Sequence, residues 1–109
     1  MLNAYKLFTR STAVYPDAQK GTAQALAYTA LGLSGEAGEV ANKVKKLLRD
    51  SDTPEQRREI GSEAGDLIWY WVRLCDELGL DPESVIQENI AKLESRKVRG
   101  VLKGSGDHR

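Results

Sequence analysis

Two pairs of acidic residues have the type and the spacing that metal-dependent chemistry requires. Glu36 and Glu39 lie three positions apart, and so do Glu63 and Asp66, which places each pair on one face of a helix, one turn apart. Taken alone, such a pair is also typical of a solvated helix face. Carboxylates grouped in this way can bind a divalent cation, and oxygen-only ligands favour Mg²⁺ or Mn²⁺ over zinc or copper.

The helical phase of the two pairs indicates a shared site. At about 100° per residue, both pairs flank the apolar stripe of their helix on the same side and at the same offset. The stripes comprise Leu33, Ala37, Val40, Val44 and Leu47 in one helix and Ile60, Leu67, Trp71, Leu74 and Leu78 in the other. Packed antiparallel, these helices would bring four carboxylates together at the border of the core. Repulsion and partial burial would then require a neutralising cation.

Basic and amide side chains at matching positions complement the acidic pairs. Asn89, Lys92 and Arg96 lie on one flank of a third apolar stripe, at the offset that the carboxylates show. Lys43 and Lys46 continue the first acidic row. Lysine and arginine can hold the phosphate oxygens that a metal ion leaves free, so the expected ligand is a polyphosphate.

The residues between these groups indicate four helices that position them. Thr53-Pro54-Glu55-Gln56 is typical of a helix start with a capping box, Asp81-Pro82-Glu83-Ser84 repeats the arrangement, and Gly79 is placed to end the helix between them. Strand signals are absent. The sequence predicts an all-α bundle in one domain, residues 1–109, with an irregular basic tail over 99–109 and helices at about 3–14, 22–49, 54–78 and 82–98.

The composition argues against several classes of protein. The 109 residues include 16 Lys and Arg and 16 Asp and Glu, and this zero net charge argues against stable nucleic-acid or membrane-surface binding. The balance is uneven, with +4 over 1–49, −8 over 50–88 and +4 over 89–109. The lone His108 argues against histidine metal sites, including di-iron bundles. One cysteine, Cys75, and the lack of a membrane span or signal-peptide pattern predict a cytoplasmic protein.

One segment indicates that the chain works as an oligomer. Residues 67–72, Leu-Ile-Trp-Tyr-Trp-Val, are apolar nearly all round the helix, so they must be covered on more than one side. Four helices of a small chain offer little to cover them, which favours a homodimer or homotetramer with a shared core. A single central helix wrapped by its own chain is the alternative.

These motifs resemble the MazG-like branch of the all-α nucleoside triphosphate pyrophosphohydrolases. The resemblance runs from about residue 22 to the tail and rests on Leu33–Val40 (LSGEAGEV), Glu63-Ala64-Gly65-Asp66 and Asn89-x-x-Lys92-x-x-x-Arg96. It implies a helical bundle, dimeric or a dimer of dimers, that hydrolyses a (d)NTP to the monophosphate and pyrophosphate with two or more Mg²⁺ or Mn²⁺ ions. It also implies that the four carboxylates hold the metals as the catalytic residues, and that Asn89, Lys92 and Arg96 contact the nucleotide.

The resemblance leaves the substrate and the general base open. Gly35 stands where longer members carry a further Glu, so another carboxylate or the metal-activated water itself would serve as the base. The ending from Arg99 to Asp107 is similar to short, often phage-encoded members. That similarity favours a deoxypurine nucleotide such as dGTP and nucleotide-pool control in a host cytoplasm. Hydrolysis of damaged nucleotides, or of dCTP or dUTP, and a non-enzymatic dimeric adaptor or antitoxin-like role are the alternatives.

Overall fold

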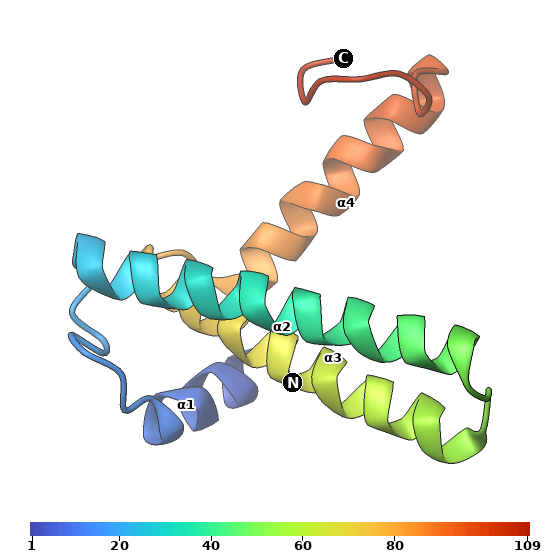
Figure 1. The fold of residues 1–109 in the computed structure, drawn as a ribbon. Helices are drawn as coiled ribbons and strands as arrows, with labels where there is room; N and C mark the ends of the chain where they lie inside the picture. The colour runs from blue at the N-terminus through green and yellow to red at the C-terminus, as the bar shows by residue number, and fades with distance from the viewer.

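The computed structural model describes residues 1–109 as four helices joined by loops and followed by an irregular tail (Figure 1). The all-α prediction is confirmed, and no predicted helix end differs from the observed one by more than two residues. The helices are α1 (Leu2–Thr12), α2 (Ala23–Arg49), α3 (Pro54–Glu77) and α4 (Pro82–Arg99). None of them combines the length and the apolar character that crossing a membrane requires.

The two longest helices, α2 and α3, form an antiparallel hairpin that carries the predicted acidic residues (Figure 1). At its turn, the Thr53 hydroxyl accepts a hydrogen bond from the Gln56 N–H at 3.2 Å, and the Gln56 side-chain oxygen accepts one from the Thr53 N–H at 3.2 Å. The predicted capping box is therefore confirmed. Farther along, a Cβ at Gly32 would overlap the Tyr70 ring, so the helices approach closely one turn before Glu36.

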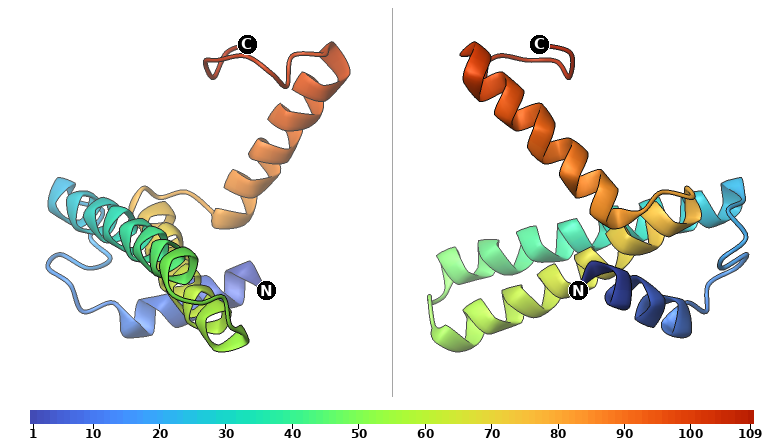
Figure 2. Two further views of the ribbon diagram at one scale, coloured as in Figure 1. Left: turned by 45° about the vertical axis from the view of Figure 1, so that its right-hand side comes forward. Right: turned by 180° about the vertical axis from the view of Figure 1, so that it is seen from behind.

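The connection from α3 to α4 turns the chain away from this hairpin. Gly79 has a φ of 73°, the left-handed conformation that glycine tolerates, and ends α3 as predicted. The prediction of a second capping box is wrong, because the Asp81 side chain accepts a hydrogen bond from the Ser84 hydroxyl at 3.3 Å and none from a backbone N–H. Its other carboxylate oxygen lies 4.0 Å from the Lys6 ammonium, so Asp81 forms an ion pair with α1. Beyond this point α4 projects outward and makes no contact with α2 (Figure 2).

The interior of the chain is small and polar. Ten residues are buried, and half of them carry polar or charged side chains. They are Tyr15, Ala25, Val72, Cys75 and Pro82 on the apolar side and Thr9, Thr29, Arg73, Glu77 and Arg96 on the polar side. Charged side chains are almost never fully buried unless they are paired. The partners of Arg73 and Glu77 therefore decide how this part of the chain holds together.

The buried charges on α3 form one connected network. The Arg73 guanidinium donates hydrogen bonds to the Tyr15 hydroxyl at 3.1 Å, to Glu77 at 3.2 Å and to Asp76 at 2.6 Å. The Tyr15 hydroxyl donates in turn to the Glu77 carboxylate. Burial and this bond to Glu77 raise the pKa of Tyr15 to about 12. Because a buried charge is tolerated only when it is paired and hydrogen-bonded, each group in the network depends on the others.

The same carboxylates attach the N-terminal segment to α3. Glu77 accepts the backbone N–H groups of Gln19 at 2.7 Å and Gly21 at 2.9 Å, which lie in the loop between α1 and α2. Asp76 accepts from the Arg10 guanidinium of α1 at 2.8 Å, and this hydrogen bond is the main reason that the pKa of Asp76 falls to about 2. The network therefore holds α1 against the hairpin.

A single chain exposes more surface than a compact domain of its length. Its radius of gyration is 16.6 Å, against about 13 Å for a compact chain of this size. Its accessible surface is 7398 Å², against about 6,000 Å² expected from its mass. Val72 in the apolar segment 67–72 is buried, but Ile68 is 44% exposed. Such an excess is typical of a chain that shares its core with a partner, and the oligomer remains a prediction.

Candidate metal and phosphate site

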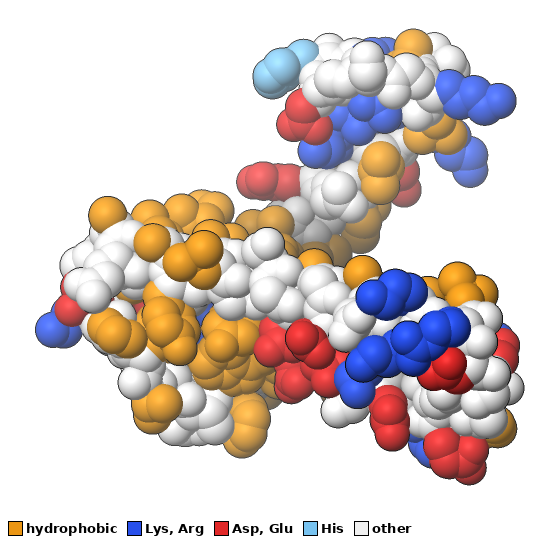
Figure 3. All heavy atoms as spheres, viewed as in Figure 1, with side chains coloured by type: hydrophobic (Ala, Val, Ile, Leu, Met, Phe, Trp, Pro, Cys, Tyr) orange, Lys and Arg blue, Asp and Glu red, His pale blue; other side chains and the backbone are white.

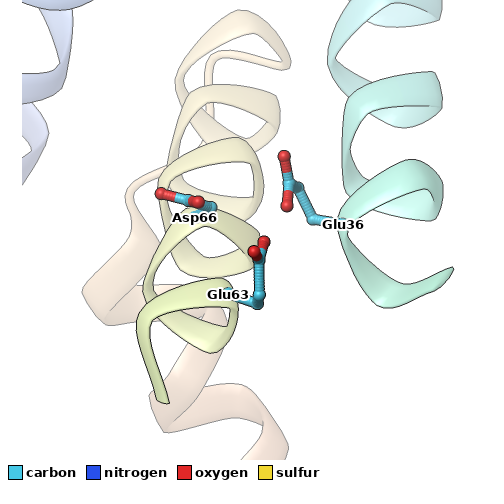
Figure 4. A group of neighbouring side chains, drawn as sticks. All are labelled: Glu36, Glu63 and Asp66. Carbon is cyan, nitrogen blue, oxygen red and sulfur yellow. The ribbon is translucent and has the colours of Figure 1, made fainter. Parts of the chain in front are cut away.

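Three of the predicted acidic residues meet halfway along the α2–α3 hairpin. Glu36 reaches from α2 toward α3, while Glu63 and Asp66 come from successive turns of α3 (Figure 4). Each residue offers a carboxylate oxygen, and these oxygens all lie within 4.8 Å of one another. The close approach of the helices at Gly32 and the three-residue spacing on α3 together bring them into one group.

Glu36 is the member of this group on which the crowding of charge has the clearest effect. Burial raises its pKa, and so do the adjacent carboxylate of Glu63 and the negative charges of Asp66 and Glu39. Its Oε2 atom is buried and has no hydrogen-bond partner. Buried polar atoms are nearly always paired, and a divalent cation would pair this oxygen and offset the repulsion. A donor set made only of carboxylates fits Mg²⁺ or Mn²⁺.

Glu39, the fourth predicted ligand, lies outside this group of three. It is exposed one turn farther along α2, although its charge still contributes to the raised pKa of Glu36. The three-residue step that keeps Glu63 and Asp66 together on α3 does not bring Glu39 into the group on α2. The single chain therefore gathers three of the four predicted carboxylates.

The two predicted lysines of α2 lie beside the acidic group, toward the turn of the hairpin. The Lys43 ammonium is 3.8 Å from Glu63 and 3.7 Å from Glu59. Lys46 lies one turn farther and, with Lys43, lines a polar pocket of about 220 Å³. Figure 3 shows this order on the surface, with acidic side chains at the middle of the hairpin and basic ones next to them. Lys43 therefore lies beside the carboxylate group, on its side toward the turn of the hairpin.

The basic row of α4 does not reach the carboxylates of its own chain. Asn89 is exposed, and Lys92 and Arg96 instead bind Asp107 of the C-terminal tail, at 2.9 Å and 3.2 Å between the charged atoms. The reason is the direction of α4, which leaves the hairpin after Gly79 and makes no contact with α2. In the single chain the two predicted halves of the site are separate.

An apolar groove next to Asp66 was not predicted from the sequence. It has a volume of about 890 Å³ between α1 and α3, and its walls include Tyr5, Phe8 and Ile68. Burial, and the nearby charge of Asp66, raise the pKa of Tyr5. Tyr5 and Phe8 are three residues apart on α1, which is a visible apolar face, but the sequence does not show which helix that face meets.

Comparison with known proteins shows the family of this chain. The family model for the MazG nucleotide pyrophosphohydrolase domain matches residues 24–100 of this sequence, from the start of α2 to the end of α4. The Gene 37 protein of Mycobacterium phage L5 is 46% identical over 112 aligned positions, which cover 99% of this chain and 98% of that protein. No solved structure matches the chain. The matched region contains every predicted site residue, and the chain belongs to the MazG nucleotide pyrophosphohydrolase family.

Proposed function

We propose that this chain hydrolyses a nucleoside or deoxynucleoside triphosphate to the monophosphate and pyrophosphate, with Mg²⁺ or Mn²⁺ as cofactor. The family relationship supports nucleotide pyrophosphohydrolase activity in general. The observation that carries the metal assignment is the buried, unpaired Oε2 of Glu36 beside Glu63 and Asp66. Two or more cations would be bound by these three residues and by Glu39 at their edge.

The side chains of this protein divide the work on the triphosphate. Bound cations would neutralise the phosphate oxygens and lower the pKa of the attacking water. Gly35 offers no side chain, so one of the four carboxylates, or the metal-activated water itself, would have to serve as the general base. Basic and amide side chains would hold the remaining phosphate oxygens and steady the departing pyrophosphate. These are Lys43, Lys46, Asn89, Lys92 and Arg96.

The basic row of α4 completes the site of a second subunit in this proposal. Lys92 and Arg96 lie on a helix that projects away from its own acidic group, and the chain exposes large apolar side chains, among them Ile90 and Leu93 on the same helix. A homodimer, or a tetramer built from two such dimers, would cover that surface and bring each α4 to the carboxylates of the partner.

A mixed dimer tests this arrangement directly. Glu36→Gln and Arg96→Ala are each expected to inactivate the protein, but chains carrying one change each should regain about a quarter of wild-type activity when they are co-expressed at equal levels. Half of such dimers are mixed, and only a site formed from two chains leaves one intact site in each mixed dimer. Activity that stays at the level of the separate variants would show that each chain supplies its own site.

The apolar groove beside Asp66 is the surface that we propose for the nucleobase. Tyr5 and Phe8 of α1 offer aromatic surface in this groove, whose wall also includes Gly65, the residue before Asp66. Nucleobases stack on aromatic side chains of this kind. We further propose a purine deoxynucleotide, with dGTP as the first candidate, and a role in nucleotide-pool control. A groove lined mainly by apolar residues discriminates between related groups by only about 10–200-fold.

The nature of the products tests the reaction itself. The protein is incubated with each of the four NTPs and four dNTPs in Mg²⁺ or Mn²⁺, and the products are separated. We expect the monophosphate and pyrophosphate in equal amounts, with the highest kcat/KM for a purine dNTP. Release of orthophosphate in place of pyrophosphate would contradict the proposed reaction, and a complete lack of turnover would favour a binding role.

A further inference from the structure

The C-terminal tail folds back along α4 and is tied into a loop by its last residue. Gly100 has a φ of 72° and ends α4, and the chain then reverses its direction (Figure 1). The Arg109 guanidinium donates hydrogen bonds to the carbonyls of Val101 at 3.1 Å, Leu102 at 3.2 Å and Gly106 at 2.6 Å. The tail therefore has a defined conformation of its own.

This loop brings the Asp107 carboxylate to the two cations of α4. Its Oδ1 atom lies 2.9 Å from the Lys92 ammonium and 3.2 Å from the Arg96 guanidinium, which also donates to the Asp107 backbone carbonyl at 2.7 Å. Hydrogen bonds from Lys92 and Arg96 lower the pKa of Asp107. Arg96 is only 5% exposed, whereas every other residue of α4 beyond Ile86 is exposed. The tail thus covers a cation that would otherwise face solvent.

We propose that Asp107 is an internal competitor for phosphate, which must displace the tail from Lys92 and Arg96 in order to bind. The inference rests on the proposed function, in which the same two cations hold the phosphates. One carboxylate offers this pair a single charge, whereas pyrophosphate or a triphosphate offers several charges and more oxygens. Ion pairs as exposed as that of Asp107 contribute little, so phosphate can displace it. The apparent affinity for phosphate is then the intrinsic affinity multiplied by the fraction of molecules in which the tail is detached from Lys92 and Arg96.

The first test compares Asp107→Asn with the full-length wild type. Calorimetric titration with magnesium pyrophosphate should give a dissociation constant about three- to tenfold lower for the variant. If the nucleotide is turned over, its KM should fall in the same proportion. Glu94→Gln is the control, because Glu94 is an exposed acid on α4, the helix that carries Lys92 and Arg96, and the ion pairs of those two residues go to Asp107 and not to Glu94. The control should leave the dissociation constant unchanged.

The second test follows the tail itself through the only histidine of the chain. His108 adjoins Asp107, so its imidazole proton resonance reports the position of the tail at a fixed pH. Saturating magnesium pyrophosphate should move this resonance in the wild type toward its position in Asp107→Asn. In the variant, which has lost the contacts of the Asp107 carboxylate with Lys92 and Arg96, pyrophosphate should move it much less.

Several outcomes would overturn the inference. Asp107→Asn could bind pyrophosphate no more tightly than the wild type, Glu94→Gln could tighten binding equally, pyrophosphate could fail to bind at all, or the His108 resonance could stay fixed at saturation.

The failure of the proposed function is distinguished by separate results. If pyrophosphate displaces the tail but no nucleotide is hydrolysed, the reaction is wrong and the tail competitor stands. If nucleotides are hydrolysed and Asp107→Asn changes nothing, only the tail inference is wrong.

Discussion

Glu36→Gln is expected to inactivate the protein and, at the same time, to raise the Tm of the metal-free chain. The loss of kcat/KM should exceed the roughly 10–100-fold that follows removal of a residue that only supports a metal ligand. The Tm should rise because the change removes a charge that is partly buried and repelled by Glu63 and Asp66. Turnover assays and thermal unfolding in the presence of a chelator measure the two effects.

Metal binding provides a third measurement on the same variant. Mn²⁺ should raise the Tm of the wild type, since a ligand at 100 times its dissociation constant stabilises the folded state by about 2.7 kcal/mol. Glu36→Gln should lose most of this shift. Glu55→Gln is the control, because Glu55 is an exposed acid on α3 outside the group of three, and it should retain both turnover and the shift. A Glu36→Gln protein that keeps its activity within tenfold would reject the metal assignment.

Arg73→Met is expected to have the largest effect on folding. The variant leaves the fully buried Glu77 carboxylate without its positive partner, and breaking a buried pair in this way costs about 3–5 kcal/mol. Small domains have a total stability of about 5–15 kcal/mol, so a large part of the folding free energy is at risk. Urea unfolding followed by circular dichroism measures the loss.

Two further variants distinguish the buried Arg73–Glu77 ion pair from the exposed Arg10–Asp76 ion pair. Arg10→Met removes the other cation that binds Asp76, and since Arg10 is largely exposed, the cost should stay below about 1 kcal/mol. Combining Arg73→Met with Glu77→Gln should recover part of the lost stability, because the unpaired charge is gone. If Arg73→Met fails to fold, a double variant that folds would itself show that the unpaired Glu77 charge is the cause. A loss for Arg73→Met no larger than that for Arg10→Met would show that the network contributes little.

Local features of the fold could be predicted because neighbouring residues decide them. The Thr53 capping box and the end of α3 at Gly79 depend on residues within one turn of each other. Helical phase likewise placed Glu36, Glu63 and Asp66 on facing sides of two helices, and a short turn makes those helices antiparallel neighbours. The second capping box was wrong because the Asp81 side chain accepts from the Ser84 hydroxyl and faces Lys6 of another helix, and does not accept from a backbone N–H of α4.

The burial of Arg73 and Glu77 could not be predicted, because it also depends on residues that are distant in the sequence. Arg73 and Glu77 are four residues apart, which in a sequence is typical of an exposed ion pair on a helix. Their burial depends on Tyr15 and on the loop after α1, whose N–H groups bind Glu77 from more than fifty positions away along the chain. Nothing within one turn of Arg73 indicates that this loop returns to it.

The sequence by itself therefore determined the helices, the residues on each helical face and, through them, the family and the grouping of Glu36, Glu63 and Asp66. Only the tertiary structure decided that Glu39 lies at the edge of that group, that α4 turns away from it and that Asp107 binds Lys92 and Arg96. Periodicity specifies the direction of a side chain around its own helix. It does not specify the angle between helices, which depends on a few backbone torsions near Gly79 and on contacts between distant residues, nor the path of the tail after Gly100.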